Sequence, residues 1–423
     1  MRRARLAATV LAAAVVLAGC TGPGAGAAPP TAGPAPQGPA PQDPATFLPL
    51  VITPVEGAPS PVRGTDGRLH VVYELQVLNA GPRAATLTSV ESLADGPGGR
   101  VVGTVAGPEV TARSLLVGDY TLPPVPVADV PAGRTVLLIL EDVYDTPEAV
   151  PAAVVHRVRA TFGPLPPGQA TFAGDFPETS GQVTRTPIRI DGPAPVVVGP
   201  PLAGPSWVAV NACCELSPHR GAMLPLDGRI NGSERYAIDW SRFDLNARPI
   251  VDLAAGTQAT YAGDPARNED YFTFDQPVLA VGDGTVVTVV GDLPEAPPHQ
   301  FLTLPATDLG GNRIVLDLGN GVYAFYAHLK TGSPAVRVGD RVRRGQEIGR
   351  TGNSGNTSEA HLHFGLMDSP QPLTADNLPF VIDTMTWVGT VTPDTVVAEP
   401  PRGPRSGELP LLYSAVDFPE APR

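Results

Sequence analysis

Hydrophobic and polar residues alternate along several short runs between residues 47 and 190. In the run 69–77, one face carries Leu69, Val71, Tyr73, Leu75 and Val77, and the other carries His70, Glu74 and Gln76. Residues 154–162 repeat the pattern, and turn-forming residues at 79–82 and 131–133 separate such runs. Alternation with a period of two predicts half-buried strands. We therefore expect residues 46–191 to form a β-sandwich of immunoglobulin-like type.

The second half of the chain also predicts strands rather than helices. Its β-rich segments are separated by glycine-containing turns and cover residues 278–290, 313–318, 322–328 and 346–351. The fold class that we expect is therefore all-β. We predict a second domain over residues 206–385, joined to the first by a proline-rich linker at 192–205 and followed by an irregular tail at 386–423.

The first 45 residues predict export and a tether. Three arginines precede an apolar run that ends in Leu17-Ala18-Gly19-Cys20, and this run is too short to span a bilayer. Its end resembles the lipobox of bacterial lipoproteins, in which the cysteine becomes the lipidated amino terminus. We expect residues 1–20 to be a signal peptide, residues 21–45 to be a disordered Pro/Gly/Ala tether, and the protein to be extracytoplasmic and lipid-anchored to the bacterial cell membrane through Cys20.

Composition narrows the classes of partner. A net charge of −13 argues against a nucleic-acid partner, because phosphate binding needs clustered lysine and arginine.

At 423 residues, the chain exceeds what one hydrophobic core usually organises, which favours two folded domains.

Candidate chemistry is concentrated in the second domain. His361 and His363 lie two residues apart, so on a strand both imidazoles face the same side, as a metal centre requires. His328 closes an earlier predicted strand. A pair of histidines at this spacing is by itself a weak signal.

Three longer segments make the pattern specific. PVLAVGDGTVV, YAFYAHLK and VGDRVRRGQEIGRTGNSGNTSEAHLHFGL resemble, in order and spacing, the LytM-like (lysostaphin-type) zinc endopeptidases that cut peptidoglycan peptides. The resemblance implies an antiparallel β-sheet peptidase domain with about one zinc ion per chain. It also implies that Asp239 and His363 are zinc ligands, and that His361 and His328 polarise the attacking water and stabilise the oxyanion.

One position departs from the family pattern. The family has a histidine ligand four residues before the aspartate, and this chain has Arg235 there. A guanidinium has no lone pair to offer a metal. On a strand, residues 235 and 239 lie on the same face, so we expect Arg235 to project toward the site. Either a substitute ligand completes the centre, or Arg235 pairs with Asp239 and supplies positive charge where the metal would have been.

We consider His219 the best substitute ligand, because the stretch of chain between His219 and the segment that carries Asp239 is long enough to fold back toward the site. Cys213 and Cys214 are also near, but an oxidising location favours a disulfide between them or simple burial.

Two functions follow from these residues. The first is a zinc metalloendopeptidase that hydrolyses peptidoglycan peptide bonds. The alternative is a catalytically inactive LytM-like module that binds wall peptide or activates another hydrolase. The sandwich domain, which has no cysteine and two histidines on alternating strands, is expected to serve as a spacer or to dock a protein partner.

Overall fold

A computed structural model describes residues 47–55, 57–119, 121, 124–168, 176–252 and 257–421. The predicted signal peptide, the tether and Cys20 lie outside these residues. Within the described part of the chain, strands far outnumber short helices, which confirms the all-β prediction. No helix in these ranges is long and apolar enough to cross a membrane.

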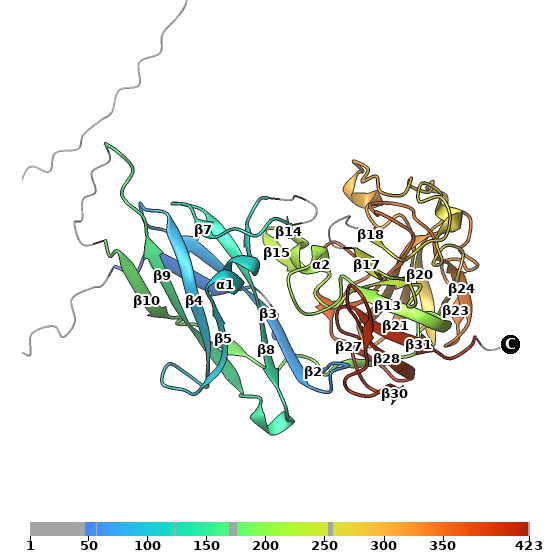
Figure 1. Ribbon diagram of the computed structural model, residues 1–423, viewed down its shortest axis with the longest axis horizontal. Helices are drawn as coiled ribbons and strands as arrows, with labels where there is room; N and C mark the ends of the chain where they lie inside the picture. Colours follow the sequence, from blue (N-terminus) through green and yellow to red (C-terminus); the bar gives the residue numbers. More distant parts are fainter. Residues whose placement is uncertain are drawn as a thin grey trace, which may run out of the picture. The chain divides into compact units, whose positions relative to one another are not determined.

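Two antiparallel sheets organise residues 50–189 (Figure 1). The first consists of β1 (Leu50–Pro54), β3 (Leu69–Asn79), β8 (Thr135–Tyr144), β6 (Ser114–Leu116) and β2 (Val62–Arg63). The second consists of β10 (Thr179–Val183), β9 (Ala153–Phe162), β4 (Ala85–Ala94), β5 (Val101–Ala106), β11 (Ile188–Arg189) and β7 (Asp129–Val130). A shared core of buried side chains from both sheets, including Leu75, Val90 and Val158, holds them together. The immunoglobulin-like topology stays a prediction.

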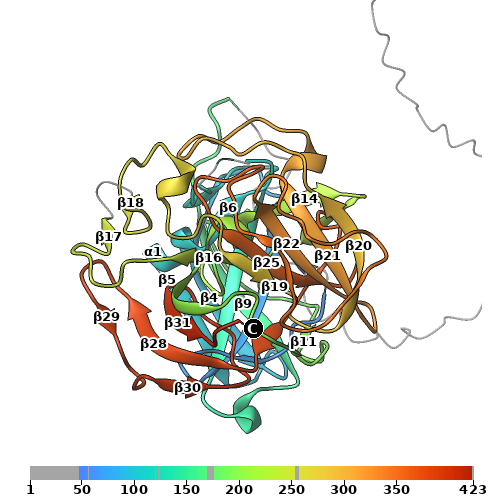
Figure 2. The same cartoon turned by 90° about the vertical axis from the view of Figure 1, so that its right-hand side faces the viewer.

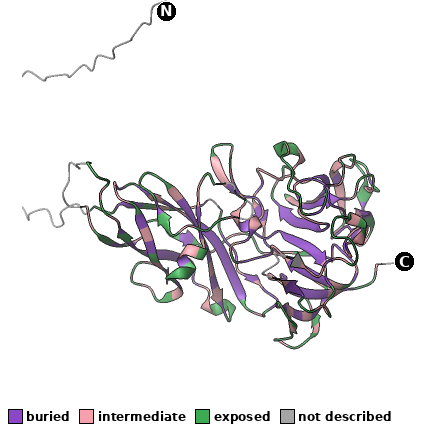
Figure 3. Cartoon of the chain, turned by 45° about the horizontal axis from the view of Figure 1, so that its top comes forward, coloured by how far each residue is buried: buried purple, intermediate pink, exposed green. Residues whose placement is uncertain are grey.

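A larger sheet organises residues 204–418 (Figure 2). Its strands, in spatial order, are β23 (Arg341–Val342), β20 (Gly284–Val290), β21 (Asn312–Gly319), β22 (Val322–Leu329), β25 (Leu362–Met367), β16 (Ile238–Arg242), β13 (Gly204–Val210), β31 (Ser414–Phe418), β28 (Met385–Val391) and β29 (Val396–Val397), with β26 (Asn377–Leu378) and β30 (Gly403–Arg405) attached. Trp207, Trp240 and Trp387 are almost completely buried in it. Figure 3 shows that buried residues follow the strands while exposed ones gather in the loops.

Shorter elements complete the chain. Two-stranded pairs are β12 (Val196–Val198) with β27 (Phe380–Ile382), β14 (Met223–Leu226) with β15 (Arg229–Gly232), β17 (Val251–Asp252) with β18 (Thr257–Gln258), and β19 (Pro277–Leu279) with β24 (Glu347–Arg350). The short helices are α1 (Pro108–Ala112), α2 (Pro218–Gly221), η1 (Pro147–Ala149), η2 (Asn268–Asp270) and η3 (Ala306–Asp308).

The prediction of an irregular tail at 386–423 is wrong. Strand β31 lies between β13 and β28, so residues near the end of the chain form an interior strand of the large sheet. Val416 pairs with both Trp207 and Trp387. Most of the prolines and charged residues of this segment lie outside its strands, although Pro404 and Arg405 are in β30 and Asp417 is in β31, and they obscure the short apolar strands.

The segment 192–205 is not a simple linker. Val196–Val198 forms β12, which pairs in parallel with β27, and β13 begins at Gly204. Backbone pairing with a strand 184 residues later (Val196 to Phe380) fixes this segment in the fold.

Strand β3 is not half-buried as the alternation predicts. Nearly all its residues are buried, and the Glu74 side chain is completely inaccessible to solvent. On the predicted polar face of β3, Arg220 and Arg235 cover Glu74, which the pattern within residues 69–77 cannot reveal.

His70 on this strand is held between two carboxylates. Its Nδ1 lies 2.6 Å from Glu141 Oε1, and its Nε2 lies 3.0 Å from Asp66 Oδ1. Burial disfavours the imidazolium, but the two carboxylates outweigh it and raise the pKa of His70 to about 9.

We expect His70→Gln to destabilise the protein in a pH-dependent way. A pKa raised on folding stabilises the fold fully below the unfolded value near 6.5, and this contribution disappears as the pH rises through about 9. The loss should reach at most roughly 3 kcal/mol at pH 6 and shrink toward pH 9.5. Urea unfolding of the variant and the wild type at both pH values measures it.

His299→Gln is the matched control, because the His299 ring bonds the Tyr271 hydroxyl rather than a carboxylate. A loss for His70→Gln that stays constant from pH 6 to 9.5 would contradict the charged pairing.

Candidate metal centre

Three adjacent strands bring the candidate residues together. Strand β25 lies between β16 and β22, and His363 is directly opposite Asp239 on one side and Ala327 on the other. Residues directly opposite in an antiparallel pair project to the same face of the sheet. His328 follows Ala327 with a positive φ of 59°, and His361 immediately precedes β25.

His219 reaches the same point from α2. Its Nε2 lies 3.1 Å from Asp239 Oδ1 and 3.1 Å from His363 Nδ1, and His363 Nδ1 lies 3.0 Å from Asp239 Oδ1. All three residues are buried. The structure thus brings His219, Asp239 and His363 into one cluster with mutual distances near 3 Å.

The hydrogen bonds around the cluster determine which atoms have free lone pairs. His219 Nδ1 donates to the Ala237 carbonyl oxygen at 3.1 Å, and a carbonyl can only accept. In the neutral ring, Nε2 is therefore unprotonated and points at another imidazole nitrogen and a carboxylate oxygen. Such a convergence of acceptors requires a proton or a cation between them.

The charge distribution agrees with this interpretation. Burial opposes charge on both Asp239 and His219. Their mutual attraction prevails, because it lowers the pKa of Asp239 well below its usual value and raises the pKa of His219 to about 9. Asn211 adds a hydrogen bond from Nδ2 to Asp239 Oδ2 at 2.7 Å.

His361 and His328 lie beside this cluster. His361 Nε2 is 3.3 Å from Asp239 Oδ1, and its Nδ1 is 2.8 Å from the Glu359 carbonyl oxygen. His328 Nδ1 donates to the Ser354 carbonyl oxygen at 2.8 Å. The ring centroids of His328 and His361 are 4.7 Å apart. Burial and the neighbouring imidazoles push the pKa of His328 well below its usual value, whereas Asp239 raises the pKa of His361 despite burial.

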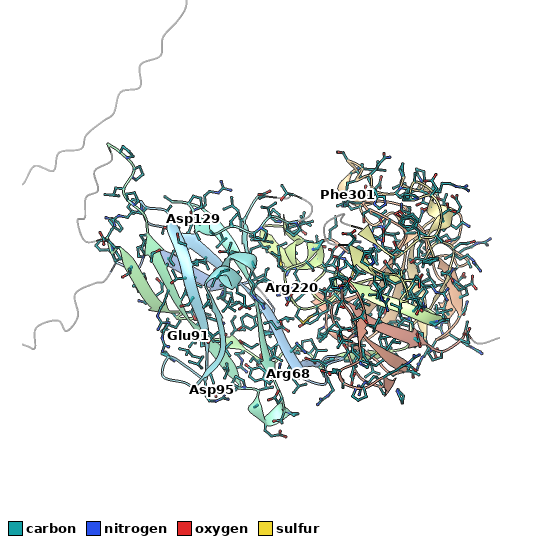
Figure 4. The ribbon with its side chains drawn as sticks, viewed as in Figure 1. Arg68, Glu91, Asp95, Asp129, Arg220 and Phe301 are labelled. Atoms are coloured by element: carbon teal, nitrogen blue, oxygen red, sulfur yellow. A yellow bond between two sulfur atoms is a disulfide. The ribbon has the colours of Figure 1, made fainter. Side chains whose placement is uncertain are left out.

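A cleft of about 960 Å³ opens over these residues. His219, Asp239, His328, His361 and His363 all line it. Phe301, labelled in Figure 4 and 55 % exposed, contributes an apolar wall. The buried polar cluster is therefore accessible to a ligand of peptide size.

The expectation that Arg235 projects toward the site is wrong, and so is the alternative in which it pairs with Asp239. Strand β16 begins only at Ile238, so Arg235 lies in the preceding turn and the same-face argument does not apply. Its guanidinium binds Glu74 instead, with Nη2 to Oε2 at 2.7 Å and Nε to both carboxylate oxygens.

Cys213 and Cys214 form a disulfide with each other, one of the two outcomes that an oxidising location favours. A disulfide sulfur has no thiolate to offer a metal. These residues therefore do not compete with His219.

Sequence reasoning missed several residues that support the cluster. Asn211 and Glu74 carry no recognisable motif, and Glu74 lies 165 residues before Asp239. The carbonyl groups of Ala237, Ser354 and Glu359 fix the histidine tautomers, and backbone groups leave no trace in the sequence.

Comparisons with known proteins agree with this geometry. Residues 270–375 match the profile of Peptidase family M23, a range that includes His328, His361 and His363. The chain is 34 % identical over 148 residues to the peptidoglycan DD-endopeptidase ShyA of Vibrio cholerae, which is 34 % of this chain and 29 % of that protein. It is 37 % identical over 111 residues to lysostaphin of Staphylococcus simulans, which is 25 % of this chain and 21 % of that protein.

Among solved structures, the catalytic domain of lysostaphin from Staphylococcus simulans is 27 % identical, with 28 % of this chain and 84 % of that chain covered and a TM-score of 0.19. The aligned region spans less than a third of the curated relatives named above. The assignment therefore rests on the sequence matches and on the ordered motifs that carry them. Residues 270–375 thus match Peptidase family M23, in agreement with the resemblance of the sequence motifs to LytM-like endopeptidases.

Proposed function

We propose that this protein is a zinc metalloendopeptidase that hydrolyses peptidoglycan peptide bonds. The convergence of His219 Nε2, Asp239 Oδ1 and His363 Nδ1 within about 3 Å carries the proposal. Two imidazole nitrogens and one carboxylate oxygen match the donor set that zinc takes in catalytic sites. The carbonyl that accepts from His219 Nδ1 is the kind of outer partner that orients ligating histidines.

In this proposal, His219 takes the place of the ligand that Arg235 cannot provide. It supplies the third donor that the family has four residues before the aspartate, and it does so from a different element, the short helix α2. Zinc held by these residues would lower the pKa of water and polarise a carbonyl oxygen.

The protein's own residues supply the proton chemistry. His328 and His361 each have Nδ1 bonded to a backbone carbonyl, so each neutral ring has an Nε2 lone pair that can accept a proton or a hydrogen bond. Burial favours neutral His328, which suits a proton acceptor. Asp239 raises the pKa of His361, so this ring can also carry a proton on Nε2 and donate it, which suits stabilisation of an oxyanion.

The relatives support a proposal for the substrate. Two of them are described as a peptidoglycan DD-endopeptidase and a glycyl-glycine endopeptidase. We propose peptidoglycan peptides as the substrate class here, in an extracytoplasmic location, with the chain anchored to the membrane through lipidated Cys20.

Zinc analysis tests the metal centre. We expect about one zinc ion per purified chain, and His219→Ala and His363→Ala should each reduce the bound zinc strongly, because each removes one of three donors. Inductively coupled plasma mass spectrometry after dialysis measures it. His299→Ala, which alters another cleft histidine, should leave the zinc content unchanged.

A wild type that binds no zinc and leaves purified peptidoglycan uncut would favour the alternative, an inactive module that binds wall peptide or activates another hydrolase.

Separate variants test the proton chemistry. His328→Ala and His361→Ala should retain zinc but lower kcat by about 10²- to 10⁴-fold, because they remove groups that act on the reacting atoms rather than on the metal. Release of peptide fragments from purified peptidoglycan is the assay. Loss of zinc equal to that of His363→Ala would instead make these residues ligands.

Fractionation tests the anchor. Cys20→Ala should move the protein from the membrane to the soluble fraction, because the variant lacks the thiol that lipidation needs. Immunoblotting after a carbonate wash measures the distribution. Continued sedimentation of the variant with membranes would place the anchor elsewhere.

A further inference from the structure

One carboxylate of the first domain holds two arginines of the second. Glu74 Oε1 accepts from Arg220 Nη2 at 2.8 Å, and Glu74 Oε2 accepts from Arg235 Nη2 at 2.7 Å. The side chains of Glu74 and Arg220 are fully buried, and that of Arg235 is 9 % exposed. Figure 4 labels Arg220.

A buried charge cluster of this kind is weak evidence for stability. Removing charges from water is costly, and replacing such a cluster with apolar residues is often neutral or stabilising. Its hydrogen bonds, however, impose a specific geometry on the groups that they join. The position that the ion pairs impose on the chain segments of Arg220 and Arg235 therefore matters more than the free energy that the pairs contribute.

Arg220 fixes the position of His219. The two are consecutive in α2, a single turn of four residues that is too short to be stable alone. Arg220 Nη1 donates to the Cys214 carbonyl oxygen at 2.7 Å, and Nη2 also lies 3.4 Å from the carbonyl oxygens of Tyr73 and Leu140. The side of α2 at Gly221 packs closely, since a Cβ there would lie 3.1 Å from Pro124 and 3.2 Å from Leu115.

Arg235 fixes the approach to Asp239. It precedes β16 by three residues, and its guanidinium is bonded to the same carboxylate that holds Arg220. The two segments that deliver His219 and Asp239 are thus both tied to one side chain of β3.

We propose that Glu74 is a positioning residue of the metal centre, so that the sandwich sheet sets the separation of His219 from Asp239. The inference rests on the proposed zinc site. The proposal also gives Arg235 a role. At the position where the family pattern has a metal ligand, Arg235 binds Glu74 of the sandwich sheet, and His219 supplies the metal-binding nitrogen instead.

The test compares zinc affinity in the full-length protein, by competition with a chromophoric chelator. Glu74→Gln keeps the shape but removes the charge, and should weaken zinc binding by about 10- to 100-fold, as loss of a partner beyond the ligands does. The visible spectrum of the cobalt-substituted protein should shift with it. Glu74→Asp, which retains the charge, should recover part of the affinity.

Glu91→Gln is the control. It removes a carboxylate of the same domain that pairs with Arg157 and Arg159 on the sheet away from β3, and zinc affinity and the cobalt spectrum should stay at wild-type values. A folded Glu74→Gln variant with wild-type affinity and spectrum would overturn the proposal.

If Glu74→Gln fails to fold, the triple variant Glu74→Leu, Arg220→Met, Arg235→Met replaces the cluster with apolar side chains. It should fold and still bind zinc at least tenfold more weakly; wild-type affinity would overturn the proposal. If the wild type binds zinc and all Glu74 variants bind it with the same affinity, this inference alone is overturned. If the wild type binds no zinc, the proposed zinc-dependent function is overturned as well.

Discussion

The cross-strand register between β16 and β25 is the constraint on which the centre depends. It places Asp239 opposite His363, so a carboxylate and an imidazole share one buried face of a sheet. A lone carboxylate there would be costly to bury. Polar neighbours offset this cost: Asn211 donates to one oxygen of Asp239, and three histidines lie within 3.3 Å of the other.

The residues with local patterns were predictable from the sequence. The two-residue spacing of His361 and His363 correctly predicts that they lie together, and the ordered glycine-rich motifs lie within the residues that match Peptidase family M23. His219 was expected beside Asp239 because its loop can fold back, and the structure brings the two within 3.1 Å. These successes share one property, since each concerns residues within 206–385, the segment that carries the family motifs.

Contacts between distant segments were not predictable. Glu74 occupies a polar position in an alternating strand, which normally indicates exposure to water, yet two arginines from residues 220 and 235 cover it. Arg235 was expected to face the metal site because the strand was assumed to begin earlier. In both cases the deciding information is the identity of a partner more than a hundred residues away.

The position of β31 has a consequence for biosynthesis. Because this strand fills the gap between β13 and β28, Trp207 and Trp387 are not covered until residue 416 has been made. Contacts across about 200 residues close slowly, since a long loop must be ordered first. A ribosome-bound chain would therefore lack an interior strand of this sheet until residue 416 has been synthesised.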